Sequence, residues 1–215
     1  MSAPRPEVAI ERYRKHAAGY DASSARTMRL RRRVIGLLRL RPGDTVLDVA
    51  CGTGLSFPLI LESIGPAGRL VGVEVSPDMM ALARERVARE GWSNVTLIQA
   101  PMEKAAAPFP LDAILFNYTH DVLRSPLALL AVFRDAKPGA RVAAAGMKLF
   151  PWWLAPLNLY ACAKARPYMT TFEGLASPWD MLAKYVPGLA VTPTQFGMGY
   201  IAHGTCPGAI HQNHK

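Results

Sequence analysis

One stretch decides the fold of this chain: Val46-Leu47-Asp48-Val49-Ala50-Cys51-Gly52-Thr53-Gly54-Leu55-Ser56. It begins with apolar residues around one carboxylate, a pattern that is typical of a short buried strand. The glycine pair that follows lets the backbone turn sharply beside a ligand before a helix begins. Open parallel sheets bind nucleotide-like ligands at such an edge, beyond the carboxyl ends of their strands. The stretch therefore predicts an α/β fold with a ligand site at the glycine turn, residues 50–54.

The spacing of the glycines distinguishes two kinds of nucleotide ligand. A dinucleotide fingerprint, Gly-x-Gly-x-x-Gly, has a third glycine where the helix packs closely on the strand, and Phe57 stands there in this chain. Glu74, however, ends the next apolar run about twenty residues further on, where a carboxylate can accept the hydroxyls of a ribose. The sequence therefore predicts ribose recognition and disfavours a pyrophosphate.

The run Asp48-Val49-Ala50-Cys51-Gly52-Thr53-Gly54 resembles the Asp/Glu-x-Gly/Ala-x-Gly-x-Gly motif of the class I S-adenosylmethionine (SAM) dependent methyltransferases. The resemblance implies SAM as the cofactor and a doubly wound, mostly parallel, seven-stranded Rossmann-like sheet. It also implies a C-terminal antiparallel hairpin and an N-terminal helical lid. We expect the cofactor to be bound by Tyr20, Asp48, Ala50, Gly52, Thr53, Gly54, Glu74, Val75, Met79, Pro101, Met102 and Asn117.

The chain has the size of one domain, since it has 215 residues of which 50% are hydrophobic. We divide residues 1–215 into a helical lid (1–41), a SAM-binding core (42–146), an aromatic substrate-side insert (147–187) and a closing hairpin with a tail (188–215). The first residues lack the apolar core of a secretory signal, and no apolar run reaches about eighteen residues. We therefore expect a cytoplasmic protein, with peripheral membrane contact as an alternative.

The remaining elements follow the alternation expected of such a fold. Apolar runs predict further strands at Arg69–Val75, Val95–Gln99, Leu111–Asn117 and Arg141–Ala145. Between them we expect helices at Leu55–Ile64, from Pro77 to Glu90, and from Ser125-Pro126 to a turn at Lys137-Pro138-Gly139. Val191–Phe196 and Tyr200–His203 predict the closing hairpin.

Two N-terminal segments precede the first strand. The pattern Tyr13-x-x-x-Ala17-x-x-Tyr20-Asp21 resembles the lid of the ubiquinone/menaquinone-type methyltransferases, which implies that Tyr20 faces the methionine end of SAM and Tyr13 the substrate. Tyrosines that merely pack on an amphipathic helix are the alternative. Seven arginines and no acids then lie from Arg26 to Arg41, among apolar residues. Such a helix either contacts an anionic membrane or is a surface helix with a solvated basic face.

The loop after the third strand departs from the family pattern. Many relatives have Asp-x-Glu there, whereas this chain has Pro101-Met102-Glu103. We therefore expect the adenine to be recognised by backbone groups near Met102 and by apolar contact, with Met79 either at the adenine edge or in the core.

The catalytic candidates are His120, Tyr20 and Tyr118. SAM already carries an activated methyl group, so a protein need only orient the acceptor and, where necessary, remove its proton. His120 is favoured because the unperturbed pKa of histidine lies near neutrality and the residue follows the fourth strand. A purely structural histidine is the alternative. Asn117 either orients the acceptor or contacts the amino-acid end of SAM, and Asp48 is expected to anchor the ammonium group of SAM.

The insert indicates an apolar or amphipathic acceptor. Residues 147–187 contain eight aromatic side chains, and residues 149–163 have one polar side chain, Asn158. The segment either covers an apolar substrate, dips into a membrane interface, where Trp is favoured, or packs on its own domain.

Several acceptor classes remain open. The Arg26–Arg41 helix, the tandem aromatics of the insert and the run Gly-Pro-x-Gly-Arg-Leu-Val-Gly-Val-Glu-x-Ser-Pro-Asp-Met-Met at residues 65–80 resemble the bacterial phospholipid or betaine-lipid N-methyltransferases. The resemblance implies an amine or hydroxyl of a small or amphipathic acceptor such as a phospholipid head group. The net charge of +9 favours an anionic partner or surface. A soluble specialised metabolite or a quinone is the alternative, as is a non-catalytic SAM-binding module. Nucleic acid is not expected, because the Asn/Asp-Pro-Pro-Tyr run used on base amines is absent at Asn117-Tyr118-Thr119. No metal is expected either, since the spacing of His203, Cys206, His211 and His214 matches no common site.

Overall fold

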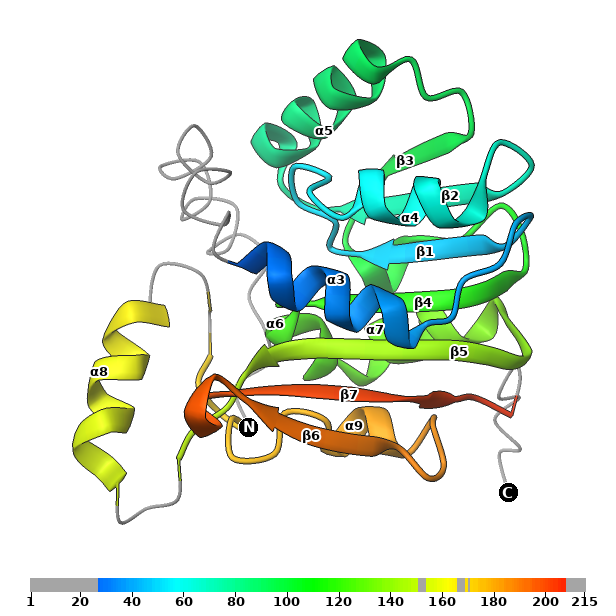
Figure 1. The fold of residues 1–215 in the computed structure, drawn as a ribbon. Helices are drawn as coiled ribbons and strands as arrows, with labels where there is room; N and C mark the ends of the chain where they lie inside the picture. The colour runs from blue at the N-terminus through cyan, green and yellow to red at the C-terminus, as the bar shows by residue number, and fades with distance from the viewer. Residues whose placement is uncertain (1–26, 151–153, 166–168, 170, 208–215) are drawn as a thin grey trace.

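A computed structural model of the chain describes residues 27–150, 154–165, 169 and 171–207. Seven strands form one sheet in the order β3-β2-β1-β4-β5-β7-β6 (Figure 1). Strands β1 to β5 are parallel, and β7 is antiparallel to both β5 and β6. This confirms the predicted mostly parallel sheet with a C-terminal antiparallel hairpin. The strands are β1 (Thr45–Val49), β2 (Arg69–Glu74), β3 (Val95–Gln99), β4 (Leu111–Asn117), β5 (Ala136–Met147), β6 (Ala190–Thr194) and β7 (Gly199–Thr205).

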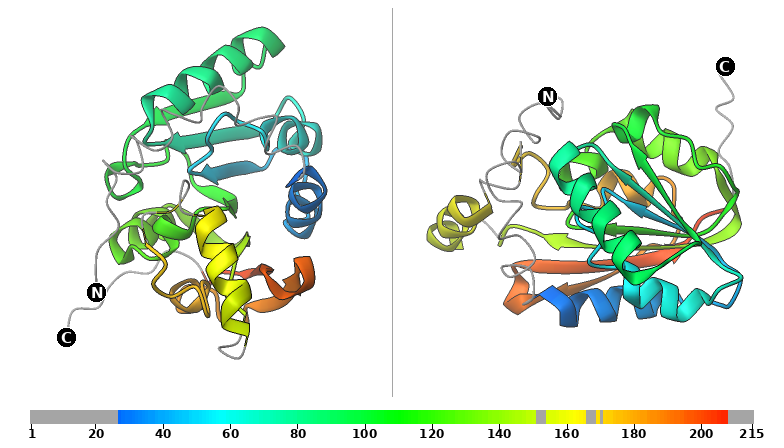
Figure 2. Two further views of the ribbon diagram at one scale, coloured as in Figure 1. Left: turned by 90° about the vertical axis from the view of Figure 1, so that its left-hand side faces the viewer. Right: turned by 90° about the horizontal axis from the view of Figure 1, so that it is seen from above.

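Helices cover both faces of the sheet (Figure 2). Helices α3 (Met28–Leu37), α4 (Phe57–Ile64) and α5 (Pro77–Glu90) pack on one face, and α7 (Pro126–Arg134) and α9 (Asp180–Ala183) on the other. Successive side chains of a strand point to opposite faces. In β1, Val46 therefore joins the core under α3 and α4, whereas Leu47 and Val49 join the core under α7.

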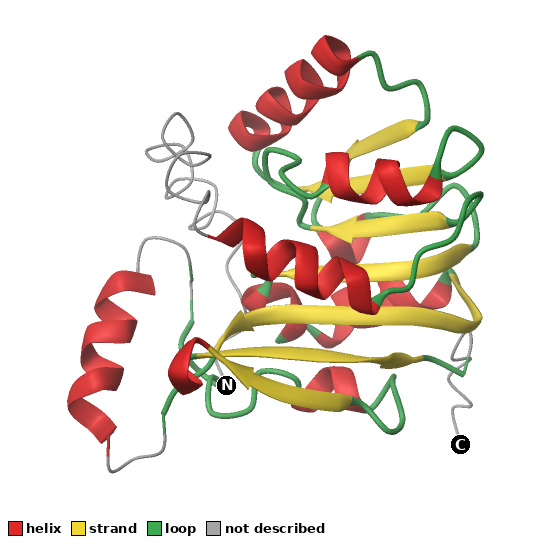
Figure 3. Ribbon diagram, viewed as in Figure 1, coloured by secondary structure: helices red, strands yellow, loops and turns green. Residues whose placement is uncertain are grey.

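Shorter elements lie where the strands end (Figure 3). Two 3-10 turns, η2 (Met102–Lys104) and η4 (Gln195–Gly197), follow β3 and β6, and the short helix α6 (His120–Leu123) follows β4. Helix α8 (Ala155–Ala165) stands outside the sheet, on the side at which the parallel strands end (Figure 1). No helix among the described residues is long and apolar enough to cross a membrane.

The start of α5 shows how local sequence sets an element. Ser76 caps the helix by accepting a hydrogen bond from the backbone N–H of Met79, and Pro77 occupies the first helical position. Gly91 ends the helix in the left-handed conformation, with φ of 68°. The predicted range for this helix is confirmed.

Several predicted boundaries were wrong. The strand expected over Val191–Phe196 ends at Thr194, because Gln195 and Phe196 have positive φ, of 51° and 56°, and belong to η4. Helix α4 begins at Phe57 rather than at Leu55, because the chain is still turning there: the Phe57 N–H donates to the Gly54 carbonyl at 3.0 Å. Residues 137–139 are part of β5 rather than a turn before it. Gly139 donates to the carbonyl of Cys206 at 2.9 Å, so β5 extends along the C-terminal segment before its register with β4 becomes regular.

The second half of the aromatic insert is core. The ring of Tyr185 stacks on Phe133 at 4.7 Å, and that of Trp179 lies 5.0 Å from Tyr200. Packing on its own domain, one of the three roles considered for the insert, therefore describes this half. Trp152 and Trp153 lie outside the described residues, as do Tyr13, Tyr20 and the rest of the predicted lid before residue 27.

Candidate functional site

The glycine turn has the backbone that its sequence predicts. Ala50, Gly52 and Gly54 all have positive φ, of 50°, 60° and 77°. A Cβ on Gly52 would meet no heavy atom within 4 Å, so this part of the turn borders open space. A Cβ on Gly54 would lie 2.7 Å from the ring of Phe57. The first glycine therefore leaves room for a ligand, and the second leaves room for the helix that follows.

Phe57 explains why the third glycine of a dinucleotide site is missing. Its side chain is fully buried, and its ring lies 3.0 Å from the position of a Cβ on Gly72 in β2. Its other neighbours include Trp92, whose ring centroid is 6.4 Å away. The ring thus occupies the space between helix and strand that a third glycine would leave free, in agreement with the expectation against a pyrophosphate.

Glu74 does more than the sequence indicated. Its carboxylate is buried at the end of β2, where Oε2 accepts the Gly52 N–H at 3.0 Å and Oε1 accepts the Ser76 N–H at 2.8 Å. Each carboxylate oxygen has a second acceptor position, so ribose hydroxyls could still bind. Burial raises the pKa of Glu74, and the backbone N–H groups partly oppose this shift. Glu74 therefore also fastens the glycine turn to the start of α5.

Asp48 is the second buried carboxylate of the site. It is 2% exposed, and its Oδ2 has no hydrogen-bond partner among the described residues. Burial raises the pKa of Asp48 to about 7; the positive charge of Arg31 opposes the shift, and the negative charge of Glu74 adds to it. A cationic ligand group beside Oδ2 would stabilise the ionised form. This environment fits the predicted role of anchoring an ammonium group.

Arg31 was missed as a site residue. We took the whole of the Arg26–Arg41 helix as a basic surface, but Arg31 is 5% exposed and its Nη1 donates to the Ser56 hydroxyl at 2.9 Å. The signal was present in the spacing, because Arg31 shares one helical stripe with the buried residues Val34, Ile35 and Leu38. Arg29, Arg32 and Arg33 on the same helix are exposed.

The loop expected to meet the adenine is partly core. Met79 and Met102 are buried, whereas Val75 and Pro101 are half-buried. Met102 belongs to the core under α7. Glu103, which keeps the acidic position of the family pattern, accepts a hydrogen bond from the Ser125 hydroxyl at 2.9 Å and so fixes η2 to the start of α7. Adenine contact by these residues stays a prediction.

The loop after β4 gathers buried polar atoms. Asn117, Thr119 and His120 are 6%, 5% and 8% exposed. Among the described residues, both amide atoms of Asn117, Oγ1 of Thr119 and Nδ1 of His120 have no hydrogen-bond partner. Because β4 pairs with β1, this loop and the glycine turn end neighbouring strands. Tyr118, with φ of 61°, is half-buried, and its hydroxyl accepts a hydrogen bond from Nε2 of Gln195 at 3.3 Å.

The protonation of His120 follows from its partner. Its Nε2 lies 3.1 Å from the carbonyl oxygen of Glu173, which can only accept, so Nε2 carries the proton and Nδ1 of the neutral ring carries a lone pair. Burial lowers the pKa of His120, although the nearby Asp121 and the Glu173 carbonyl act in the opposite direction. The imidazole is therefore neutral at pH 7, with a buried basic nitrogen.

The predicted site residues thus fall into two groups at one edge of the sheet. Asp48, Gly52 and Glu74 form the first, at the ends of β1 and β2, and Asn117, Tyr118 and His120 form the second, at the end of β4. Tyr20, expected in both groups, lies outside the described residues. Thr53 is buried, and its carbonyl accepts a hydrogen bond from Arg86 of α5 at 2.8 Å, which further fixes the turn.

Comparison with protein families identifies this arrangement. A family model described as a methyltransferase domain matches residues 40–178, which is more than half of the chain. The chain belongs to this family. It is a member of the class I SAM-dependent methyltransferase family, whose cofactor is SAM. The match covers the strands that carry both groups of site residues.

Two curated relatives have quinone-related names. A demethylmenaquinone methyltransferase of Symbiobacterium thermophilum is 31% identical over 140 residues, covering 61% of this chain and 55% of the relative. The ubiquinone/menaquinone biosynthesis C-methyltransferase UbiE of Ectopseudomonas mendocina is 35% identical over 152 residues, covering 64% and 57%. The chain therefore spans little more than half the length of these relatives.

Solved structures share the fold at lower identity. A SAM-dependent methyltransferase from Aquifex aeolicus has a TM-score of 0.56 and 22% identity, with 82% of this chain and 89% of that chain covered. A phosphoethanolamine N-methyltransferase 2 from Haemonchus contortus, solved with phosphomonomethylethanolamine and S-adenosylhomocysteine, has a TM-score of 0.57 and 18% identity, covering 74% and 38%. At these identities the likeness concerns the fold alone.

The residues present fit SAM. Gly52 borders open space, Glu74 offers acceptor positions for ribose hydroxyls, and Asp48 has a buried oxygen suited to a cation. These three residues would hold the nucleoside and the ammonium group. Asn117, with both amide atoms unpartnered among the described residues, would contact either the amino-acid end or the acceptor.

Proposed function

We propose that this chain transfers the methyl group of SAM to an amphipathic acceptor whose reactive group loses a proton to His120. Bound SAM supplies a methyl group that is already activated on a sulfonium. The chain's own part is to orient the acceptor, to remove its proton and to keep water away. The observation that carries the proposal is the buried Nδ1 of His120, which has no partner in the part of the chain that the structure describes and whose tautomer is set by the Glu173 carbonyl.

The polar atoms around His120 support this assignment. Asn117 and Thr119 contribute an amide and a hydroxyl that are buried and have no partner among the described residues. A methyl acceptor with a ring oxygen or hydroxyl could form hydrogen bonds with both the NH₂ group and the carbonyl oxygen of Asn117. The neutral state of the imidazole at pH 7 is the one required of a proton acceptor.

Apolar exposure near the site supports an amphipathic acceptor. Leu157 and Leu159 of α8 are 48% and 74% exposed, and Phe196 of η4 is fully exposed. We call these three side chains the apolar rim. Helix α8 stands beyond the edge of the sheet at which the parallel strands end, level with β5, β7 and β6, as Figure 1 and the left view of Figure 2 show.

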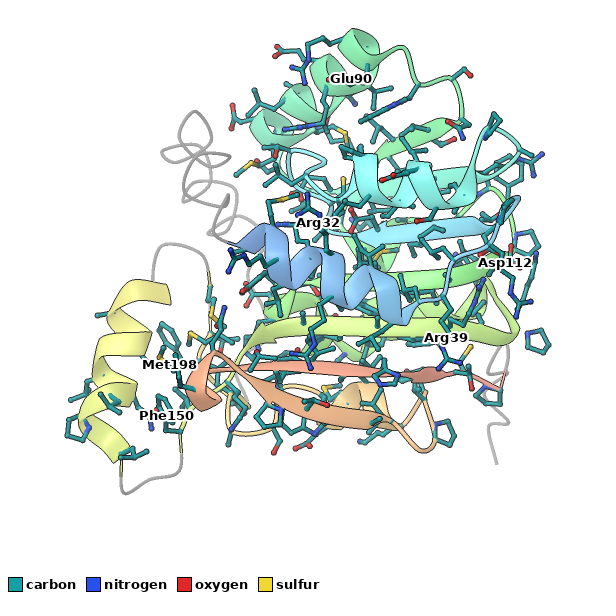
Figure 4. All side chains as sticks on the ribbon, in the orientation of Figure 1. Arg32, Arg39, Glu90, Asp112, Phe150 and Met198 are labelled. Carbon is teal, nitrogen blue, oxygen red and sulfur yellow. The ribbon has the colours of Figure 1, made fainter. Side chains whose placement is uncertain are left out.

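Packing joins the two parts of the apolar rim. Asn158 of α8 binds both backbone groups of Phe150, accepting its N–H at 2.8 Å and donating to its carbonyl at 3.0 Å. The ring of Phe150 in turn lies 3.1 Å from the position of a Cβ on Gly197 in η4 (Figure 4). The one polar side chain of residues 149–163 is thus engaged within the protein, which leaves an apolar surface toward solvent.

The apolar rim is compatible with two classes of amphipathic substrate. A quinol, the reduced form of a quinone, is favoured, because the names of the two curated relatives refer to quinones and a quinol hydroxyl has a proton that His120 can accept. A phospholipid head group is the second candidate, and the exposed residues Arg29, Arg32 and Arg33 beside the edge support contact with an anionic membrane in either case. A soluble specialised metabolite would have no use for the rim.

The test measures label transfer from methyl-labelled SAM. We expect label in a quinol, a quinone supplied in its reduced form in vesicles, and none in the phospholipids of vesicles that lack it. Label in the phospholipids alone would replace the first substrate class by the second. SAM binding without any transfer to either lipid or metabolite extracts would instead indicate a non-catalytic module.

Substitution of His120 tests the proposed proton transfer. Replacement by Asn should lower the turnover number by about 100-fold, the low end of general-base effects, while SAM affinity changes less than twofold. His203→Asn is the control, because His203 lies half-buried on β7, where its backbone pairs with Ala143 of β5 and Ala190 of β6. An unchanged turnover number in His120→Asn would remove the base from the mechanism.

A further inference from the structure

The geometry points to Gly174 as a positioning residue, which fixes the peptide that decides which ring nitrogen of His120 carries the proton. Gly174 follows Glu173, whose carbonyl oxygen lies 3.1 Å from Nε2 of His120. The catalytic meaning of this role rests on the proposed function, because His120 is the proposed base. A residue without a side chain, far from His120 in the sequence, would thus keep the base in its active form.

Residues 172–175 form a type II turn. The Leu175 N–H donates to the Phe172 carbonyl at 3.4 Å, which closes four residues into a turn. Gly174, the third of them, has φ of 77°, whereas Glu173 is not among the described non-glycine residues with positive φ. A positive φ at the third position and not at the second defines a type II turn, which requires glycine or asparagine there. The residue at position 174 therefore selects the type of turn.

The type of turn decides which backbone group faces His120. Types I and II differ by roughly half a rotation of the peptide between the second and third residues. In the type II turn this peptide directs the Glu173 carbonyl to Nε2 of His120, so Nε2 donates and Nδ1 keeps its lone pair. In a type I turn the N–H of residue 174 would take the place of that carbonyl. Nε2 would then have to accept, and the proton would move to Nδ1.

The backbone on either side of this peptide is fixed independently of it. The Glu173 N–H donates to Oγ1 of Thr171 at 3.1 Å, and the Gly174 carbonyl accepts the Ser177 N–H at 3.1 Å. Leu175, the last residue of the turn, is fully packed with 1% exposure. The Glu173–Gly174 peptide is therefore the part of the turn that can rotate while its neighbours stay in place.

Arg124 provides an alternative reason for a glycine at this position. It follows α6, one helical turn after His120, and its guanidinium atoms lie 2.7–2.8 Å from the position of a Cβ on Gly174. Gly174 could thus serve only to leave room for this side chain. If spacing is the role, every substitution at position 174 has the same effect. If turn type is the role, residues that tolerate positive φ differ from those that do not.

Two substitutions of the same glycine make this distinction. Gly174→Ala and Gly174→Asn both add a Cβ that displaces the guanidinium of Arg124, but asparagine tolerates positive φ far better than alanine. Arg124→Ala removes the guanidinium and leaves the turn unchanged. Gly188→Ala is the control for alanine at positive φ, because Gly188 has φ of 73° and open space around it. It precedes β6, which runs in the direction of β5, so it lies at the opposite edge of the sheet.

NMR identifies the protonated nitrogen of His120 directly. Long-range ¹H–¹⁵N correlation spectra distinguish the two neutral tautomers of an imidazole ring. The signal that is missing from His120→Asn assigns this ring among the five histidines. The spectra would be recorded at pH 8, where the ring is neutral because burial lowers the pKa of His120. The turnover number is measured separately, with methyl-labelled SAM and a quinol in vesicles.

The expected result is a change of tautomer in Gly174→Ala alone. The unmodified chain, Gly174→Asn, Arg124→Ala and Gly188→Ala should carry the proton on Nε2. Gly174→Ala should carry it on Nδ1 and have a turnover number lower by about tenfold or more, as the loss of a positioned base allows. SAM affinity should not change in any of these variants.

Four results would overturn the inference. Retention of the proton on Nε2 in Gly174→Ala would show that the turn does not set the tautomer. Equal effects of Gly174→Ala and Gly174→Asn would assign the glycine a role in spacing only. A changed tautomer in Arg124→Ala would assign the position of the turn to the arginine. A proton on Nδ1 in the unmodified chain would overturn the inference without any variant, and so does not depend on whether Gly174→Ala folds.

The two measurements separate this inference from the proposed function. A changed tautomer in Gly174→Ala with an unchanged turnover number would support the role of the turn and overturn the proposed base. An unchanged tautomer in Gly174→Ala, together with a turnover number that falls in His120→Asn, would keep the base and overturn the role of Gly174.

Discussion

The two halves of the sheet's carboxyl edge differ in how they hold their polar groups. At the ends of β1 and β2, both oxygens of Glu74 bind backbone N–H groups, and the Thr53 carbonyl is held by Arg86. At the end of β4, the amide of Asn117 and Nδ1 of His120 have no partner among the described residues. In the first half, hydrogen bonds within the protein fix the shape of the loops, whereas the second half has hydrogen-bonding groups that the proposed methyl acceptor would use.

The largest expected effect concerns the glycine turn, at the ends of β1 and β2. Gly52→Arg should weaken SAM binding by more than about 100-fold, because the side chain would fill the space beside the turn and the residue has φ of 60°. Gly139→Arg is the matched control, since Gly139 also has positive φ and open space but lies at the far end of β5. Calorimetry should find near-normal SAM affinity in the control. Near-normal affinity in Gly52→Arg would place the cofactor elsewhere.

A smaller effect concerns Asp48, near the end of β1, where SAM affinity and the stability of the fold can be measured separately. The folded-state pKa of Asp48 is raised from 3.8 to about 7, so the stabilising contribution of its neutral form is present below pH 3.8 and is lost as pH rises to about 7. Asp48→Asn has no such loss. As the pH rises from 5 to 8, the free energy of unfolding of Asp48→Asn should increase relative to that of the unmodified chain by on the order of 1 kcal/mol, or about 2–4 °C in Tm.

The same variant should bind SAM about tenfold more weakly at pH 8, because the ammonium loses its charged partner. Thermal melts with and without SAM at the two pH values test both effects. Arg31 and Glu74, the other charged groups that act on Asp48, remain in the variant. A pH-independent difference in Tm would show that Asp48 is not neutral in the free protein.

The smallest expected effect concerns the apolar rim. Phe196→Ser should reduce binding to vesicles of phosphatidylcholine with phosphatidylglycerol by about fivefold, since one fully exposed aromatic side chain is removed. SAM affinity should not change. Leu127→Ser is the control, because Leu127 is 66% exposed on α7 and is not part of the rim. Co-sedimentation that decreases equally in both variants would indicate general hydrophobicity rather than a defined membrane-facing surface.

Most of the site at the ends of β1 and β2 could be predicted from the sequence, because the residues that determine it are neighbours in the chain. The strand, the glycines and the capped helix at Ser76 each depend on neighbouring residues. The hydrogen bond of His120 to the Glu173 carbonyl could not be predicted, since 53 residues separate the two groups and only tertiary packing brings them together. The same holds for the link between Tyr118 and Gln195.

The errors have specific physical causes. Residues 137–139 contain a Pro-Gly pair that is typical of a turn, but backbone pairing with the C-terminal segment overrode that local preference. Composition places Arg31 with the other arginines on a basic face toward solvent or a membrane, although its helical position aligns it with the buried Val34 and Ile35. Burial of a charge is predicted poorly by charge counts, because it depends on what the rest of the chain places opposite the helix.

Glu74 also constrains how this protein could change its cofactor. One carboxylate anchors Gly52 and Ser76 and, in the proposed site, would also bind the ribose, so the shape of two loops and the choice of nucleoside would depend on a single side chain. A substitution that altered sugar recognition would release both loops at once. Evolution toward another nucleotide would therefore require the whole turn to be rebuilt rather than one contact to be adjusted.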